Sequence, residues 1–324
     1  MVSVLSRNGK QTKRRKSNHW ATYLFIFLML LYPVAHFCLM WFGVNINSIL
    51  LAFKRPNDNG VLVWSLSLWD GSSSWWDALF YNFKTLFMGF SDINQYPIYL
   101  NSMMYFVISC LITLPISFFF SYFVFQKIAG SAFYKVIFYL PSILPLLILC
   151  MAYKYSLSPG GLIPGMLEAM GIPCEDFFAD LFISTASKQW MVWLFCIWAG
   201  IGYDVILLTA GMSRIPRDIL ESCKMDGVNP FREFFRIIVP LTWPTFTTLF
   251  IFGMMSVFNV TFQPFFLTAV DKDTETIGLY IYNASRGTGL HEPATLGLFC
   301  SLVGAPIILG ARSLLNRCFK NVGF

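Results

Sequence analysis

Glu221-Ser-Cys-Lys-Met-Asp-Gly-Val-Asn-Pro-Phe-Arg-Glu-Phe-Phe-Arg-Ile-Ile-Val-Pro240 is a charged stretch that lies between two long apolar segments. Charged residues recur every few positions within it, whereas the flanking segments carry almost none. Apolar runs of membrane-spanning length separated by short charged inserts are typical of an integral membrane protein. This insert is therefore expected to lie in water beside one face of a bilayer.

Local signals within this insert predict two short helices joined by a turn. Pro216 suits the first turn of a helix, and Asp218 follows where the helix dipole favours negative charge. Gly227 is expected to end this helix, because glycine accepts the left-handed conformation. Pro230 then starts a second helix, which Pro240 is expected to end before the next span. Four apolar residues predict one apolar face on this second helix, lying along the membrane surface: Phe231, Phe234, Phe235 and Ile238.

The composition excludes an ordinary soluble protein. Of the 324 residues, 56% are hydrophobic and 12% are charged, with a mean hydropathy of +0.60, whereas soluble domains carry about 25% charged residues. The fold class predicted is an all-α integral membrane protein with six transmembrane helices, each long enough to cross about 30 Å. Pro141 and Pro145 interrupt the third helix and indicate either a tolerated kink or a bent helix at a gate. The predicted spans are 20–42, 101–126, 133–153, 190–212, 241–267 and 294–315.

The distribution of basic residues predicts the orientation of these spans. The first apolar run is too long for the core of a signal peptide, so it is expected to be an uncleaved transmembrane helix. With the N-terminus inside, the cytoplasmic pieces hold 6, 2, 5 and 3 Lys or Arg residues, which is 16 of the 23, as the positive-inside rule requires. Both termini are therefore expected in the cytoplasm. The predicted organisation is a basic N-terminus at 1–19, a first span at 20–42, an extracytoplasmic loop at 43–100, a core at 101–315 that contains the cytoplasmic loop 213–239, and a C-terminus at 316–324.

Several other function classes find no support in the sequence. The net charge of +6 comes from clusters at the ends of apolar runs, without the basic and aromatic face that nucleic acid requires. The eight cysteines show no CxxC pair of a zinc or redox site. No arrangement of side chains suggests a catalytic centre, and no Walker A sequence is present. No catalytic residue, metal or cofactor is therefore expected in this chain, and ATP and Mg would be bound by a partner polypeptide.

The predicted loop 43–100 is rich in tryptophan. Tryptophan favours the membrane interface, because its ring is apolar and its N–H seeks water. The loop is therefore either an interfacial anchor, with a short helix at 82–87, or a docking surface for an extracytoplasmic binding protein.

Polar residues inside the apolar runs are candidates for a solute pathway, because a bilayer makes them costly. Asp204 follows Tyr203 and is the only acidic residue in a predicted span. It contacts either a solute or a neighbouring subunit, or it forms a structural pair within the protein. Asn259 and Gln263 lie four residues apart, which predicts one helix face with Phe262 beside them. Amide and aromatic groups together suit the hydroxyls and C–H faces of a sugar, and helix–helix hydrogen bonding is the alternative.

The charged insert resembles the cytoplasmic EAA loop of permeases in binding-protein-dependent ATP-binding-cassette (ABC) importers. The family pattern reads E-A-A-x-x-D-G-A, five free positions, then F-x-x-I-x-x-P. Its six defining positions are matched in register by Glu221, Asp226, Gly227, Phe234, Ile237 and Pro240. The resemblance implies that this loop docks onto the ATPase, and the expected coupling set also includes Lys224, Pro230 and Phe231.

Other segments resemble the carbohydrate class of this family, on the side of the larger permease of the maltose-type importers. Gly202-Tyr203-Asp204 and residues 207–216 are similar to its fourth-span pattern, G-Y-N then L-A-G-L-x-x-I-P. Residues 266–268 and 274–282 are similar to its later pattern, L-T-G-G-P followed by T-x-T-L-x-x-Y-I-Y. The chain departs from the pattern at two places. Asp204 replaces Asn, and Ala269-Val270-Asp271 replaces Gly-Gly-Pro, which leaves the particular sugar open.

The resemblance implies a type I ABC importer permease fold and transport by alternating access. An extracytoplasmic solute-binding protein would deliver a carbohydrate, with an oligosaccharide expected, and a separate ATPase dimer would pull on the helices at 217–238. A second permease subunit would complete the pathway in the plasma (inner) membrane of a prokaryote; family precedent implies a heterodimer, and a homodimer stays open. Two rivals stay open: an ABC permease for a non-sugar solute such as a polyamine or phosphate, and a secondary transporter, which would require internal symmetry.

Overall fold

The computed structural model describes residues 19–71, 74–89, 96–128, 130–181, 183–269, 271–287 and 289–318, which divide into two compact units at residue 50. The first unit is one apolar helix. Its α1 (His19–His36) continues through a π-helical turn, η1 (Phe37–Phe42), into α2 (Gly43–Leu51). The helix therefore runs past the predicted end at 42. Its large apolar side chains are exposed, as suits a segment in lipid.

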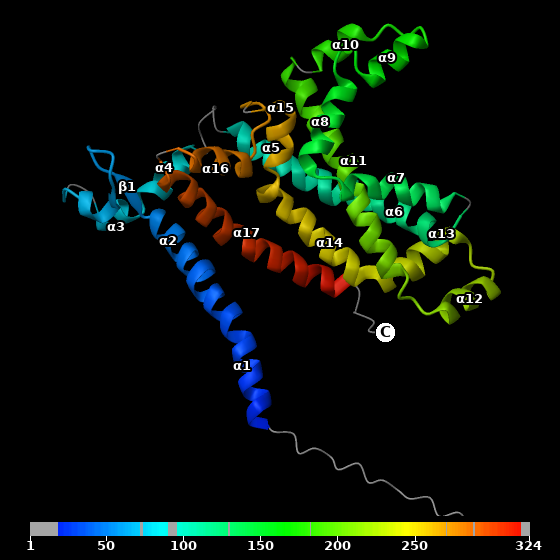
Figure 1. The fold of residues 1–324 in the computed structure, drawn as a ribbon, viewed down its shortest axis with the longest axis horizontal. Coiled ribbons are helices and arrows are strands. Elements are labelled where there is room, and N and C mark those ends of the chain that lie inside the picture. The colour runs from blue at the N-terminus through cyan, green and yellow to red at the C-terminus, as the bar shows by residue number, and fades with distance from the viewer. Residues whose placement is uncertain are drawn as a thin grey trace, which may run out of the picture. The chain divides into compact units, whose positions relative to one another are not determined.

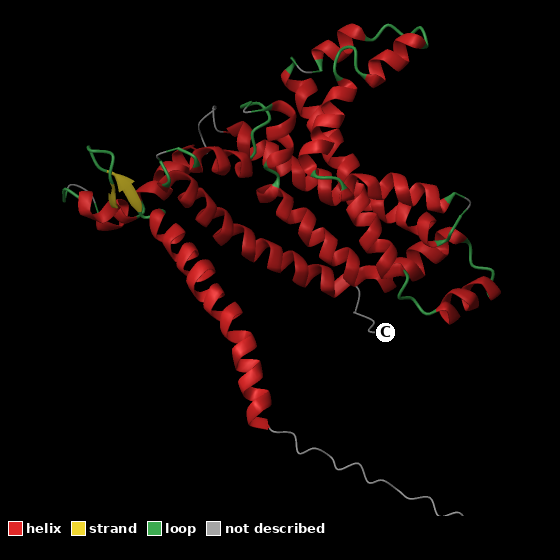
Figure 2. Cartoon of the chain, viewed as in Figure 1, coloured by secondary structure: helices red, strands yellow, loops and turns green. Residues whose placement is uncertain are grey.

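The second unit begins with a small subdomain that precedes the membrane-spanning helices. Strands β1 (Lys54–Pro56) and β2 (Leu62–Trp64) form an antiparallel pair, with Lys54 opposite Trp64. A 3₁₀ turn, η2 (Ser65–Leu68), and two helices, α3 (Trp75–Leu79) and α4 (Tyr81–Gly89), follow (Figure 2). The short helix predicted at 82–87 lies within α4 and is confirmed. The helix that follows this subdomain begins within the predicted loop 43–100, at Tyr96.

Six segments of the described chain are long and apolar enough to cross a membrane: Thr22–Leu51, Pro97–Phe125, Leu146–Ala169, Thr185–Met212, Pro230–Asn259 and His291–Arg317. The second is formed by α5 (Tyr96–Phe106), the π-helical turn η3 (Val107–Thr113) and α6 (Leu114–Phe125). The fourth is α11 (Thr185–Met212) and the last is α17 (His291–Cys318). Figure 1 shows these four helices of the second unit, α5, α6, α11 and α17, as labelled ribbons.

The prediction of one helical span at 133–153 is wrong, because two helices occupy it. α7 (Ser131–Ile143) ends before Leu144, which has an extended backbone, and α8 (Leu146–Leu157) begins after Pro145. Proline biases the residue before it away from the helical conformation and provides no N–H for a continuing helix. With 13 residues, α7 is about 20 Å long and too short to span a bilayer. The third apolar segment, Leu146–Ala169, is itself interrupted at 158–161.

Short helices lie at the end of the second unit opposite α12 (Figure 1). α9 (Leu162–Ala169) and α10 (Glu175–Asp180) follow α8. α15 (Phe262–Thr268) and α16 (Ile277–Ser285) connect the fifth span to α17.

α11 is the central helix of the second unit and packs against α6, α7 and α14 (Val239–Asn259). Its Gly202 permits a close crossing, because a Cβ there would overlap the backbone carbonyl of Phe138 in α7. Apolar side chains of α11 divide between two buried clusters. Val192 and Phe195 belong to the cluster nearer α8 and α15, whereas Leu208 and Met212 belong to the cluster nearer α12.

Candidate functional site

The charged insert begins with an isolated helix, α12 (Arg217–Met225), and its predicted start and end are confirmed. Pro216 occupies the N-cap and Gly227 has φ +65°. The amide of Gly227 donates to the carbonyl of Lys224 (3.1 Å), and that of Val228 donates to the carbonyl of Cys223 (3.1 Å). This pair of bonds is a Schellman motif, which satisfies the last carbonyls of the helix only with a left-handed residue at its end.

α12 presents its charged residues to solvent. Cys223 is buried, and Ile215 just before the helix belongs to the buried cluster nearer α12. Four residues of the predicted coupling set are exposed on α12 or the turn after it: Glu221, Lys224, Asp226 and Gly227. They are therefore available to a partner protein.

The second helix of the insert starts where predicted, at α13 (Pro230–Glu233), after the Asn229 side chain accepts a hydrogen bond from the Phe231 amide (3.2 Å). Its four apolar residues do not form one face, contrary to the prediction. Phe234 and Ile238 are buried with α6 and α11. Phe231 and Phe235 are exposed by 69% and 60%, and their rings stack at 6.2 Å between centroids. Since four residues separate the members of each pair, one helix offers an anchoring face and a free face.

The prediction that Pro240 ends this helix is wrong. The chain continues through a π-helical turn, η4 (Phe234–Ile238), into α14, so that one helical segment runs over Pro230–Asn259. The amide of Val239 bonds to the carbonyl of Phe234, five residues back. A proline inside an α-helix clashes with the carbonyl four residues earlier, and the wider π turn accommodates the ring. The η3 turn precedes Pro115 in the same way.

Sequence reasoning missed Glu233, a carboxylate inside the insert that is only 6% exposed. Gln126, at the end of α6, donates from Nε2 to Glu233 Oε1 (2.9 Å) and to the Tyr122 hydroxyl (3.1 Å). Tyr122 in turn lies 3.5 Å from Glu233 Oε2. Within the described chain Glu233 has no ion-pair partner. The polar Gln126 at the end of an apolar span was the available signal. These bonds fasten the start of the fifth-span helix to the end of the second span.

The fourth span places Tyr203 and Asp204 side by side on α11, at different depths. Tyr203 is 48% exposed, whereas Asp204 is half-buried and has the Ser117 hydroxyl of α6 as its polar neighbour. The Ser117 hydroxyl is fully buried without a well-formed hydrogen bond. Tyr203 therefore faces a surface, and Asp204 lies against a neighbouring helix.

The predicted common helix face of Asn259 and Gln263 does not exist. α14 ends at Asn259, and Gln263 belongs to the separate helix α15. The break at 260–261 is stabilised by a later segment of the chain. Thr276 Oγ1 donates to the Val260 carbonyl (2.5 Å), and Gly278 lies against the carbonyls of Phe258 and Val260. Phe262 stays 42% exposed beside the break and meets the Tyr282 ring edge to face at 5.3 Å.

Polar bonds fasten the segment 271–276 to the start of α11. Lys188 donates to Asp271 (2.5 Å) and Thr185 donates to Asp273 (2.6 Å). The hydrogen bond from Lys188 lowers the pKa of the Asp271 carboxyl below its ordinary value. Just before this segment, Ala269 has φ +59° and ψ −146°, a region that favours glycine. This is the place where the carbohydrate-class pattern has glycine, so the replacement costs backbone strain.

Residues 85–320 match the protein family described as the binding-protein-dependent transport system inner membrane component. The chain belongs to this family. The match covers every described helix from α5 to α17 and the whole charged insert. The chain is therefore a membrane-embedded permease subunit of a binding-protein-dependent transport system, and it is not itself an enzyme.

Individual members of this family are similar to the chain at modest identity. The multiple sugar-binding transport system permease MsmF of Streptococcus mutans is 27% identical over 196 residues, which cover 59% of this chain and 63% of that protein. The sn-glycerol-3-phosphate permease UgpA of Salmonella typhimurium is 27% identical over 207 residues, which cover 62% of this chain and 68% of that protein. The chain thus spans less than two thirds of MsmF.

Among solved structures, a bacterial alginate ABC transporter in complex with an alginate pentasaccharide-bound periplasmic protein contains a chain of the same fold. The TM-score is 0.74 at 20% identity, over 94% of this chain and 98% of that chain. This likeness confirms the predicted type I permease fold. No group of three or more His, Cys, Asp or Glu residues that could hold a metal ion occurs among the described residues.

Proposed function

We propose that this chain is a transmembrane permease subunit that imports a carbohydrate, in particular an oligosaccharide, by alternating access. It would act in the plasma membrane of a prokaryote with both termini in the cytoplasm. The asymmetry of Lys and Arg supports this orientation, because it puts the charged insert 213–239 on the side where ATP is available. On the same reasoning, the short helices α9, α10, α15 and α16 face the outside.

The observation that carries the proposal is the unbroken helical segment Pro230–Asn259, whose start is fastened to α6 through Glu233 and Gln126. Because the coupling loop and the fifth span share one helix, a displacement of the loop is transmitted along the span without an intervening hinge. The free face formed by Phe231 and Phe235 and the exposed charges of α12 are the proposed contacts to a separate ATPase. Phe234, Ile237 and Pro240 lie on the internal side of the same helix or are partly buried, and they transmit the movement.

The proposed pathway lies where the fifth span breaks. Phe262 and Asn259 are exposed on either side of residues 260–261, and Gln263 follows on α15. Tyr203 and Asp204 are the residues of α11 that we assign to the same pathway. A second permease subunit is needed to enclose this surface, as a heterodimer by family precedent, and an ATPase dimer and an extracytoplasmic solute-binding protein complete the assembly. The periplasmic protein bound in the alginate transporter structure supports the last of these partners.

A saccharide is favoured over a phosphorylated solute, even though UgpA is among the relatives. Phosphate recognition relies on Arg and Lys side chains, and the proposed pathway set contains neither. Aromatic and amide groups match the C–H faces and hydroxyls of a sugar, and the names of MsmF and the alginate transporter point to the same class.

The proposal is tested by purifying the chain with its partners from the native membrane and measuring ATPase activity and saccharide uptake. Glu221→Ala and Gly227→Pro are the test variants. Glu168→Ala, an exposed Glu on α9, is the matched control. We expect a complex with a second permease and an ATPase, in which the two variants lose uptake while nucleotide binding persists and the control transports normally. A chain that purifies alone and transports a solute without ATP would refute the proposal in favour of a secondary transporter.

A further inference from the structure

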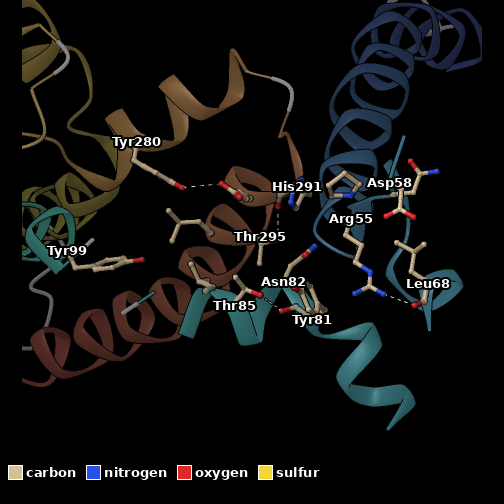
Figure 3. Close-up of a pocket in the computed structure, with 15 residues that line it drawn as sticks. Arg55, Asp58, Leu68, Tyr81, Asn82, Thr85, Tyr99, Tyr280, His291 and Thr295 are labelled. Carbon is tan, nitrogen blue, oxygen red and sulfur yellow. Dashed lines mark hydrogen bonds between the residues drawn. The ribbon is translucent and has the colours of Figure 1, made fainter. Parts of the chain in front are cut away.

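A cavity of about 660 Å³ in the second unit lies away from the proposed pathway. It lies between the β1–β2 subdomain, α4, α16 and the start of α17 (Figure 3). None of the proposed pathway residues lines it. Its volume is within the range of about 300–1,000 Å³ that is usual for small-molecule sites.

The walls of this cavity are held in place by hydrogen bonds, which makes it preformed. The buried Asn82 of α4 donates from Nδ2 to the carbonyls of Ala52 (2.8 Å) and Lys54 (2.7 Å). Thr295 of α17 donates to the same Ala52 carbonyl (3.3 Å). Arg55 Nη2 donates to the Leu68 carbonyl (2.8 Å), which ties β1 to the turn after β2. A ligand entering the cavity would therefore pay little for ordering its walls.

Two buried polar atoms on these walls have no hydrogen-bond partner within the described chain: Arg55 Nε and His291 Nδ1. Arg55 also lacks an ion-pair partner among the described residues, and its guanidinium lies 4.8 Å from the centre of the Tyr81 ring. A buried polar group left unsatisfied costs about 1–3 kcal/mol, so such groups are rare without a reason. Arg55 and His291 line the cavity as its basic side chains, and these two atoms lie beneath its surface.

The remaining lining residues narrow the chemistry of that molecule. Asp58 and Glu292 also line the cavity and supply carboxylate acceptors, and Tyr81 and Tyr280 supply aromatic rings. The two carboxylates would repel an anion, and the polar groups of the wall would lack partners if an acyl chain were bound. Hydroxyl groups both donate and accept, and aromatic rings pack well against C–H groups. A polyhydroxylated ring satisfies all of these groups together.

We propose that this cavity binds a saccharide unit at a second site, separate from the translocation pathway. The assignment of a saccharide rests in part on the proposed carbohydrate function, whereas the existence of a site rests on the preformed cavity and its polar and aromatic lining. At this outer position the site would hold part of an oligosaccharide before or during its transfer into the pathway.

Thiol protection in the purified assembly tests this inference. Thr85 lines the cavity, and a Thr85→Cys variant is labelled with a charged, membrane-impermeant maleimide in the absence of the binding protein. The parent chain measures background labelling of the native cysteines. The probes are the neutral saccharides maltotriose and diacetylchitobiose at millimolar concentration, with sn-glycerol 3-phosphate as the non-saccharide probe. We expect at least one saccharide to slow labelling several-fold and sn-glycerol 3-phosphate to have no effect.

Arg55→Leu and His291→Phe, each added to Thr85→Cys, are expected to abolish the protection. Arg286→Leu is the matched control, because Arg286 also lies over a tyrosine ring, Tyr282 at 5.6 Å, but does not line the cavity. Since Arg55 also supports the subdomain through Leu68, an unchanged labelling rate without sugar shows that its variant remains folded. If the rate changes, His291→Phe alone decides the test.

Three results would overturn the inference: protection that survives His291→Phe, protection by sn-glycerol 3-phosphate alone, or absence of protection in an assembly that transports one of these saccharides. In the third case the proposed transport function stands and the second site does not. If the assembly instead transports a non-saccharide solute and no saccharide protects, the proposed function and the second site are both refuted.

Discussion

Removing the Gln126 side chain should destabilise the protein more than removing the carboxylate to which it donates. In Gln126→Leu, the Glu233 carboxylate stays in a site that is 6% exposed. It loses its 2.9 Å hydrogen bond and keeps only the 3.5 Å contact from Tyr122. In Glu233→Leu, by contrast, the Gln126 amide and the Tyr122 hydroxyl still bond to each other at 3.1 Å.

The expected magnitudes follow from these contacts. A hydrogen bond to a charged group contributes about 1.5–3 kcal/mol, and an under-satisfied buried carboxylate adds its desolvation cost. Gln126→Leu should therefore cost about 3 kcal/mol and Glu233→Leu about 1–2 kcal/mol. The double variant should cost less than Gln126→Leu alone, because apolar groups then replace both partners.

The assay is reversible denaturant unfolding of the purified chain in detergent or lipid discs, analysed as a double-mutant cycle. Glu221→Leu is the matched control on the same loop, where the exposed side chain predicts a change within about 0.5 kcal/mol. Additive costs in the double variant, or a Gln126→Leu cost no larger than that of the control, would refute the reasoning that Glu233 is a buried, charged anchor of the coupling helix.

Three further predictions follow from the described contacts. Gly202→Ala should lower the free energy of unfolding by about 1–3 kcal/mol, because its Cβ would overlap the Phe138 carbonyl. Gly297→Ala on α17, which has open space around it, should be neutral or slightly stabilising in the same unfolding measurement. The Asp271 pKa is lowered in the folded protein. Its pair with Lys188 should therefore add about 1 kcal/mol to the free energy of unfolding at pH values above the unfolded pKa of about 4, and this contribution should be lost as the pH falls through the lower folded pKa. Asp271→Asn should remove this pH dependence, and a variant whose stability falls in acid as that of the parent does would contradict the assignment. Ala269→Gly should stabilise the protein by about 1 kcal/mol by relieving the φ +59° backbone, whereas Ala284→Gly inside α16 should cost about the same amount; equal effects would contradict the strain at Ala269.

Local signals were sufficient for part of the coupling loop. Pro216 starts α12 and Gly227 ends it as predicted, because the missing N–H of proline and the left-handed backbone of glycine act within one helical turn. The same reasoning failed at Pro240. Whether a helix stops at a proline depends on whether the preceding turn can widen, and the packing of Phe234 and Ile238 against α6 and α11 keeps that turn in place.

The sequence by itself determined the membrane class of this protein, the number of its apolar segments and the local ends of α12, since each depends on composition or on residues within a few positions of one another. Tertiary contacts decided the break after Asn259, which Thr276 and Gly278 hold from a later segment. They also decided the anchoring role of Glu233, whose partner Gln126 is 107 residues away. A residue pattern along one chain segment carries no information on which distant group will satisfy a buried carbonyl or carboxylate. Only the packed arrangement of helices supplies that partner.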